Sequence, residues 1–302
     1  MARRLFGILP TPFLASGRVD LNAAVENLRR ATRLHKINSV LLGGAYGEFT
    51  GLTDTERVEL VEAVHEGCPN AEIMGCSATL STAGTIELSR RMSAAGASLR
   101  MVTAPLAQEL TDRDVIRHFA RLGTELGRGL VAYNNVVFGR DLSREVLASV
   151  LDDEAYVGIK QGTPSIRSFL LTLELARGAA AQPFVIAASD LVAPMTLAAG
   201  ADGLSSTNVW VFPDAVLGTI EAIERGDVQA AARLHRTWSD YRELAGRLGQ
   251  PATVKAAMCL RGYSGTRDVR APLAALDDPE RAELEKVIAR CDQAYEREAR
   301  NR

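Results

Sequence analysis

A lysine and a tyrosine stand near the ends of two successive strand-like runs. Lys160 follows "YVGI", and Tyr133 lies 27 residues earlier in "GLVAYNN", a spacing typical of one strand–helix unit. An amine in a desolvated pocket has a lowered pKa and attacks carbonyl carbon, and a phenol beside it can relay protons. The pair predicts Schiff-base chemistry, although a structural lysine paired with a carboxylate fits the same position.

Lysine is rare in this chain, which gives the position of Lys160 more weight. Only Lys36, Lys160, Lys255 and Lys286 are lysines, out of 35 basic residues. An amine can be neutralised on burial, whereas a guanidinium keeps its charge. A lysine inside an apolar run therefore fits a buried reactive amine.

A glycine-rich turn follows another strand-like run, in "GGAYGE". Gly43, Gly44 and Gly47 surround Ala45 and Tyr46. Glycines at such points let backbone N–H groups converge on an anion, here a substrate carboxylate. A tight turn with no ligand would have the same sequence, so both interpretations stay open.

Two more polar residues end strand-like runs. Ser205, in "SSTN", is a candidate substrate-binding residue, and Asp190, in "AASD", is expected to cap the following helix rather than to orient the site. The loops after these two runs have no glycine-rich phosphate cradle, which disfavours a phosphorylated substrate.

Eight strand-like runs alternate with helical segments. The alternation predicts the α/β class and a closed (β/α)8 TIM barrel rather than an open sheet, and no GxGxxG follows the first run. One helix is expected to begin with a capping box of Thr53 and Glu56. The runs cover residues 5–9, 39–44, 72–77, 99–105, 129–134, 156–161, 184–189 and 202–207.

Only helices are expected after the eighth run, near 212–224, 228–247, 252–261 and 279–299. The first completes the eighth unit, and the others form a C-terminal extension. We therefore expect a barrel over residues 1–224 and a helical segment over 225–302 packed on it as one structural unit.

Composition narrows the functional classes. A net charge of −2 argues against nucleic-acid and anionic-membrane partners, and no apolar stretch approaches a membrane span or a signal peptide. The four cysteines are scattered and the four histidines lack HExxH spacing. We expect a cytoplasmic enzyme with no metal and no organic cofactor.

The order of motifs resembles the dihydrodipicolinate synthase / N-acetylneuraminate lyase family over nearly the whole chain. The matching stretches are "GILPTPF", "GGAYGEFTGLTDTERVEL", "AYNN", "GIKQ" and "VRAPLAAL". The resemblance implies that Lys160 forms an imine with pyruvate or a related 2-oxo acid, that Tyr133 shuttles protons, and that the turn at Gly44, Ala45 and Tyr46 binds the substrate carboxylate. It also implies a homotetramer built from dimers, or a homodimer.

The chain departs from the family pattern at several positions. The family often has two hydroxyl residues where this chain has Ala45 and Tyr46, and often a pair of tyrosines where it has Leu106 and Ala107. The arginine that binds the second substrate's carboxylate in the synthase corresponds to Phe138, with Arg140 two residues further on; both are candidate substrate-binding residues. These differences predict a more apolar pocket around the distal part of the substrate.

The leading functional hypothesis is a class I lyase or aldolase that makes or breaks a C–C bond through a Lys160 imine. A 2-oxo acid dehydratase or a hydratase-aldolase would use the same imine. A true 4-hydroxy-tetrahydrodipicolinate synthase remains an alternative, although the departures disfavour it. A barrel that binds a small acid without catalysis is the alternative from a different class.

Overall fold

A closed barrel of parallel strands forms the centre of the molecule. The structure is a computed structural model that describes residues 3–105, 109–136, 140–265 and 267–300. Each strand pairs with the next one along the chain, and the last pairs with the first, which confirms the predicted TIM barrel. The strands are β1 (Arg4–Ile8), β2 (Ser39–Leu42), β3 (Glu72–Cys76), β4 (Leu99–Thr103), β5 (Leu130–Asn134), β6 (Tyr156–Gln161), β7 (Phe184–Ala187) and β8 (Gly203–Ser206).

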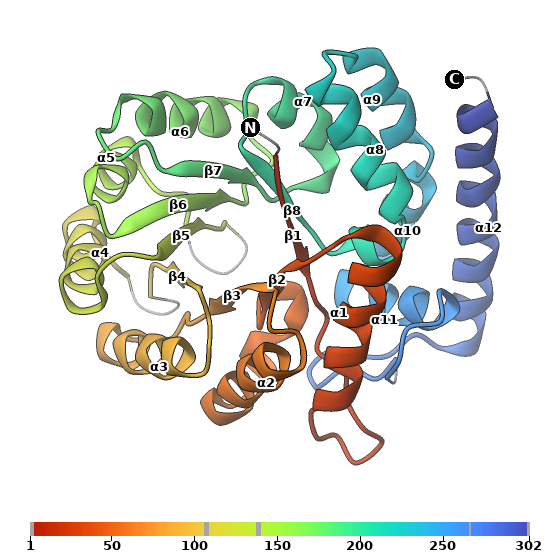
Figure 1. Cartoon of the computed structure of the whole chain (residues 1–302), viewed down its shortest axis with the longest axis horizontal. Helices are drawn as coiled ribbons and strands as arrows, with labels where there is room; N and C mark the ends of the chain where they lie inside the picture. The colour runs from red at the N-terminus through yellow and green to blue at the C-terminus, as the bar shows by residue number, and fades with distance from the viewer. Residues whose placement is uncertain (1–2, 106–108, 137–139, 266, 301–302) are drawn as a thin grey trace.

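Helices alternate with these strands and surround them (Figure 1). The predicted capping box is present at the start of α2, where Thr53 and Glu56 each bond the other's backbone N–H. The helices of the barrel are α1 (Leu21–His35), α2 (Asp54–Gly67), α3 (Thr82–Ala94), α4 (Asp112–Leu126), α5 (Arg144–Asp152), α6 (Ile166–Gly178), α7 (Ala193–Ala198) and α8 (Pro213–Glu224).

The inside of the barrel is filled by side chains from alternate strand positions, as the two-residue period of a strand requires. Phe6 and Ile8 of β1 pack in one buried cluster with Met101, Val131 and Ile186 of other strands. Because this cluster fills the interior, a ligand has access only to the ends of the barrel. The carboxyl ends of the strands carry the polar residues singled out in the sequence.

Four further helices follow the barrel: α9 (Val228–Arg236), α10 (Ser239–Leu248), α11 (Gln250–Leu260) and α12 (Asp278–Arg300). The prediction of one helix over 228–247 is wrong, because the chain turns at Thr237 and Trp238. The indole of Trp238 is buried and stacks on Phe212 with a centroid distance of 5.7 Å. This tertiary contact outweighs the local helical pattern.

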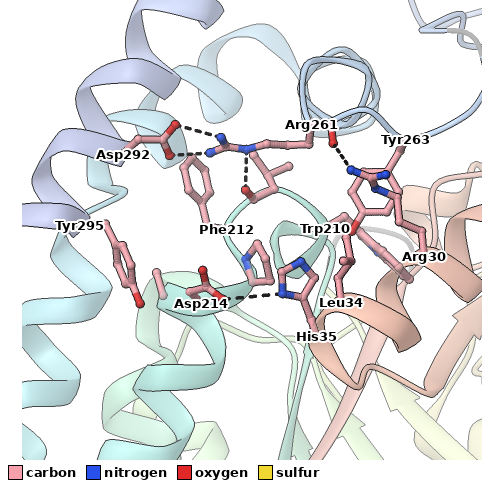
Figure 2. A pocket seen from close by; sticks show the side chains of 13 residues that line it. Arg30, Leu34, His35, Trp210, Phe212, Asp214, Arg261, Tyr263, Asp292 and Tyr295 are labelled. Carbon is pink, nitrogen blue, oxygen red and sulfur yellow. Dashed lines mark hydrogen bonds and ion pairs between the residues drawn. The ribbon is translucent and has the colours of Figure 1, made fainter. Parts of the chain in front are cut away.

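The C-terminal helices join the barrel along a seam that Figure 2 shows from close by. Arg261 donates to both carboxylate oxygens of Asp292 in α12, at 2.9 and 2.6 Å, and through Nε to the Val211 carbonyl, at 2.9 Å. Arg30 of α1 donates to the Arg261 carbonyl at 3.2 Å. On these contacts we propose that residues 225–302 and the barrel fold as one unit. No helix within the described ranges is both long and apolar enough to cross a membrane.

Candidate active site

Lys160 and Tyr133 lie side by side at the carboxyl end of the barrel. The two residues are direct partners in the parallel register of β5 and β6, so their side chains leave the sheet on the same face. The Lys160 Nζ atom lies 3.6 Å from the centroid of the Tyr133 ring. The 27-residue spacing therefore places the amine and the phenol in one site.

The Lys160 amine is buried, and none of the described residues provides a counter-ion for it. Its residue is 2% exposed, and no carboxylate of the described residues lies within 4.0 Å of it. Burial lowers the pKa of Lys160 to about 7, while the nearby Cys76 and Asp190 act in the opposite direction. A large fraction of the amine is therefore unprotonated at neutral pH, which is the form that attacks a carbonyl.

The phenol of Tyr133 remains neutral in this environment. Burial raises its pKa well above the ordinary value of 10, Tyr46 and Cys76 raise it further, and a hydrogen bond with Asn135 lowers it. Gly162 makes room for the ring, because a Cβ atom there would lie 2.9 Å from a carbon of Tyr133. A neutral phenol held against the amine can donate a proton to an adduct.

The glycine-rich turn forms a short 3₁₀ helix over Ala45–Gly47, with Gly44 as its N-cap. The Gly47 N–H bonds the Gly44 carbonyl at 2.9 Å, and Gly43 has a φ of +59°, which glycine adopts without strain. The N–H groups of Ala45 and Tyr46 lie in the first turn, where a helix offers them no acceptor. They are available to a substrate carboxylate.

A buried ion pair holds this turn in place. Glu48 has a φ of +58° and forms an ion pair with Lys255 of α11, and both side chains are almost completely buried. The second oxygen of Glu48 accepts the backbone N–H of Arg270 at 2.8 Å. The Arg270 guanidinium in turn pairs with Glu56 at 2.5 Å. The predicted closing motif at 269–276 thus ties the C-terminal segment to the turn.

The prediction that Asp190 caps a helix is wrong. Its Oδ2 atom accepts hydrogen bonds from Oγ of Ser206, the last residue of β8, at 2.9 Å and from Nδ2 of Asn208 at 2.7 Å. It caps neither of the two helices that follow it. Its Oδ1 atom is buried without a hydrogen-bond partner among the described residues. Burial raises the pKa of Asp190, and Lys160 is one of the groups that lower it. Asp190 therefore belongs to the site.

A cavity of about 440 Å³ opens beside these residues. Ser205, predicted as a substrate-binding residue, lines it, and its register opposite Phe6 turns its side chain to the barrel interior. The apolar character predicted for the distal part of the pocket rests on Leu106, Ala107 and Phe138, which lie outside the described residues. The wall described here carries polar side chains, with Thr207 and Asn208 after β8 and Arg242 of α10 in addition to Ser205. The polar lining residues include Tyr46, Asp190, Ser205, Thr207, Asn208 and Arg242.

The two residues considered for the second carboxylate do not form part of this wall. Phe138 lies outside the described residues. Arg140 instead donates to Asp112 at 2.5 Å and to the Leu110 carbonyl at 2.7 Å, at the start of α4. Its guanidinium is paired there with Asp112, and its role in binding substrate stays a prediction.

Four residues at or next to this wall were not predicted from the sequence: Thr207, Asn208, His235 and Arg242. Thr207 and Asn208 follow β8, and His235 and Arg242 come from α9 and α10. The His235 Nε2 lies 2.5 Å from the Asp190 carbonyl, and burial lowers the His235 pKa to about 4, so its neutral ring donates to that oxygen. The break between α9 and α10 brings these side chains to the barrel. Lys255, which holds the glycine-rich turn, was not predicted either, although the rarity of lysine pointed to it. Within the described residues, no group of three or more potential metal ligands occurs.

Comparison with known sequences decides the family. The sequence model of the Dihydrodipicolinate synthetase family matches residues 1–291. The chain belongs to this family. It is 26% identical over 291 residues to a 4-hydroxy-tetrahydrodipicolinate synthase of Methanococcoides burtonii, covering 94% of this chain and 96% of that protein. It is 29% identical over 294 residues to an uncharacterized DapA-like lyase of Halobacterium salinarum, covering 94% and 93%.

Solved structures of the dihydrodipicolinate synthetase family share the fold. The dihydrodipicolinate synthase of Thermotoga maritima is similar with a TM-score of 0.90 at 24% identity, covering 97% of this chain and 99% of that one. A prophage protein of the family from E. coli K12, in complex with pyruvate, is similar with a TM-score of 0.89 at 22% identity, covering 96% and 98%. The chain is an enzyme of this lyase family, as its motifs predicted.

The Glu48–Lys255 pair predicts a large loss of stability when one partner is removed. In Lys255→Met the Glu48 carboxylate stays buried without its cation, so we expect the free energy of unfolding to fall by about 3–5 kcal/mol. In Lys255→Met/Glu48→Gln the neutral amide still accepts the Arg270 N–H, so part of the loss is recovered. Urea denaturation measures the free energy of unfolding of the single and the double variant.

Lys286 provides the matched control, since it is exposed on α12. Lys286→Met is expected to change the unfolding free energy by no more than about 0.5 kcal/mol. A Lys255→Met loss as small as that of the control would contradict the role given to the buried pair.

Proposed function

We propose that the protein is a class I lyase that forms a Schiff base between Lys160 and pyruvate or a related 2-oxo acid, and makes or breaks a C–C bond next to it. The observation that carries the proposal is the buried Lys160 amine, which lies 3.6 Å from the Tyr133 ring centroid and pairs with no carboxylate in the described part of the chain. A structural lysine would have a carboxylate beside it, as Lys255 has in Glu48.

In the proposed reaction, the neutral amine adds to the ketone carbon and Tyr133 transfers protons to the departing oxygen. Loss of that oxygen as water leaves a protonated imine on Lys160 and a phenolate on Tyr133. The raised pKa of Tyr133 makes this phenolate a strong base. The substrate's own carboxylate accepts hydrogen bonds from the N–H groups of Ala45 and Tyr46. Asp190 stabilises the new positive charge on the imine nitrogen of Lys160.

Bond cleavage then uses the imine as an electron sink. The phenolate of Tyr133 takes the proton of a hydroxyl on the carbon that leaves, and that carbon departs as a carbonyl compound. The electrons of the broken C–C bond move to the imine nitrogen and give an enamine. Tyr133 returns the proton to the enamine carbon, and water releases the product. Carbon–carbon bond formation is the reverse.

The alternatives share parts of this site. A dehydratase or hydratase-aldolase would use the same imine, and product analysis by NMR separates water loss from fragmentation. Several relatives are named 4-hydroxy-tetrahydrodipicolinate synthase, but this chain lacks the paired hydroxyls at Ala45 and Tyr46, and Arg140 is engaged by Asp112. A coupled assay with aspartate semialdehyde tests that activity. A non-catalytic acid-binding role would keep its function in Lys160→Arg.

We also propose a cytoplasmic location and a homotetramer or homodimer, on the family resemblance. One solved relative with a TM-score of 0.89 and 24% identity is described as a monomeric dihydrodipicolinate synthase variant, so the fold does not fix the assembly. Sedimentation of the full chain distinguishes the states.

Incubation with pyruvate and borohydride is expected to attach a reduced pyruvyl group to Lys160, because hydride reduces the imine to a stable amine. Peptide mass spectrometry locates the adduct. Lys160→Arg should show no adduct, and Lys255→Arg, whose lysine is ion-paired, should still be labelled at Lys160. Labelling elsewhere with none at Lys160 would refute the proposed function.

The rate of this trapping is expected to rise with pH. Below the Lys160 pKa of about 7, the reactive neutral amine falls about tenfold for each pH unit, and above it the rate levels off. No fall is expected up to mildly alkaline pH, because the Tyr133 pKa is raised far above that range. A trapping rate that is constant or decreasing between pH 5.5 and 7 would contradict the assignment.

Tyr133→Phe is expected to trap pyruvate at Lys160 more slowly, because the proton relay also serves imine formation, and to slow proton exchange at the pyruvate methyl group by about 10²–10⁴-fold. Proton NMR in D₂O follows the exchange. Tyr263→Phe, at the seam of Figure 2, is the control and should exchange at the normal rate. Equal exchange rates in the unsubstituted protein, Tyr133→Phe and Tyr263→Phe would show that Tyr133 takes no part in the mechanism.

A further inference from the structure

Arg242 is a cation held rigidly at the wall of the cavity next to the candidate active site. Its guanidinium stacks on Trp238, with 4.2 Å between Cζ and the ring centroid, and Nη1 donates to the His235 carbonyl at 2.8 Å. A guanidinium has five N–H donors, so these contacts leave donors for a ligand. Both Trp238 and His235 are buried, which fixes the position of the charge.

Arg242 has no carboxylate within 4.0 Å in the part of the chain that the structure describes, unlike Arg140 and Arg261. Burial lowers the Arg242 pKa, and the charge of Asp190 raises it. Asp190 is already bonded by Ser206 and Asn208 and also acts on Lys160. A stacked guanidinium with no direct ion pair, facing a cavity, suits an anionic ligand.

Two buried hydroxyl groups line the same cavity without partners. Ser205 and Thr207 are 2% and 1% exposed, and neither Ser205 Oγ nor Thr207 Oγ1 has a hydrogen-bond partner among the described residues. An unsatisfied buried hydroxyl costs free energy, so such groups indicate a polar ligand. Hydroxyl donors beside a fixed guanidinium match the oxygens of a carboxylate.

We propose that Arg242, together with Ser205 and Thr207, binds a second carboxylate at the far end of the substrate, so that the enzyme acts on dicarboxylic 2-oxo acids. This rests on the proposed function, because the first carboxylate and the ketone occupy the turn at Ala45–Tyr46 and Lys160. Charge placement agrees with it: Asp190 acts electrostatically on the nitrogen that would carry the imine cation, and Arg242 pairs with no carboxylate of the described residues. Arg242 is then a specificity residue that takes no part in bond cleavage.

The test compares 2-oxo acids that differ only in the distal charge. Borohydride trapping at Lys160 is measured against the concentration of 2-oxoglutarate, of 2-oxoadipate, and of the terminal amide of each. At least one dianion is expected to reach half-maximal trapping at about tenfold lower concentration than its amide. Arg242→Gln should bring that ratio close to one, and Arg242→Lys should restore part of it.

Arg247 supplies the control, since it lies on the same helix, is exposed and pairs with Glu283. Arg247→Gln should keep the full ratio. If the unsubstituted protein shows no preference for either dianion, or if Arg242→Gln keeps the ratio, the proposal is wrong. If Arg242 only balances Asp190, the dianion and amide curves shift together, which also overturns it. If pyruvate itself fails to label Lys160, the proposed function is refuted and this inference falls with it. That outcome is seen before any dianion is compared with its amide.

Discussion

The desolvation of one amine governs the candidate site. Lys160 lies at the end of a barrel whose interior is filled by apolar side chains, and no carboxylate of the described residues pairs with it. Water would solvate an ammonium ion far better than this environment does, so the amine is biased toward its neutral form. The surrounding polar groups preserve this preference for the neutral amine. The Tyr133 ring lies against the amine, and Asp190 influences its pKa without forming an ion pair with it.

The contrast with Lys255 makes the constraint clear. Both lysines are buried to the same degree, yet Lys255 has Glu48 as its counter-ion and also donates to the Asp268 carbonyl at 2.8 Å. Lys255 is thus a structural lysine that fixes a turn, while burial biases Lys160 toward its neutral form. Two equally buried lysines differ because only one of them has a carboxylate of the described residues beside it.

The barrel and its central pair could be predicted because they depend on local order. Strand-like runs at regular spacing set the register that joins Tyr133 to Lys160. Asp190 was misassigned because its partners, Ser206 and Asn208, come from a different strand and loop, and sequence alone favours the nearest helix terminus. Arg242 was missed for a related reason: the break at Trp238 depends on stacking with Phe212, a contact between distant segments.

The anchoring of Glu48 by Lys255 and Arg270 has a consequence for synthesis on the ribosome. The turn that would receive a carboxylate is translated early, but the residues that hold it are added more than 200 positions later. A nascent chain that has completed all eight strands still lacks this clamp. The turn therefore gains these contacts only after the chain has been synthesised beyond Arg270, so the strands of the barrel are complete before the turn is held in place.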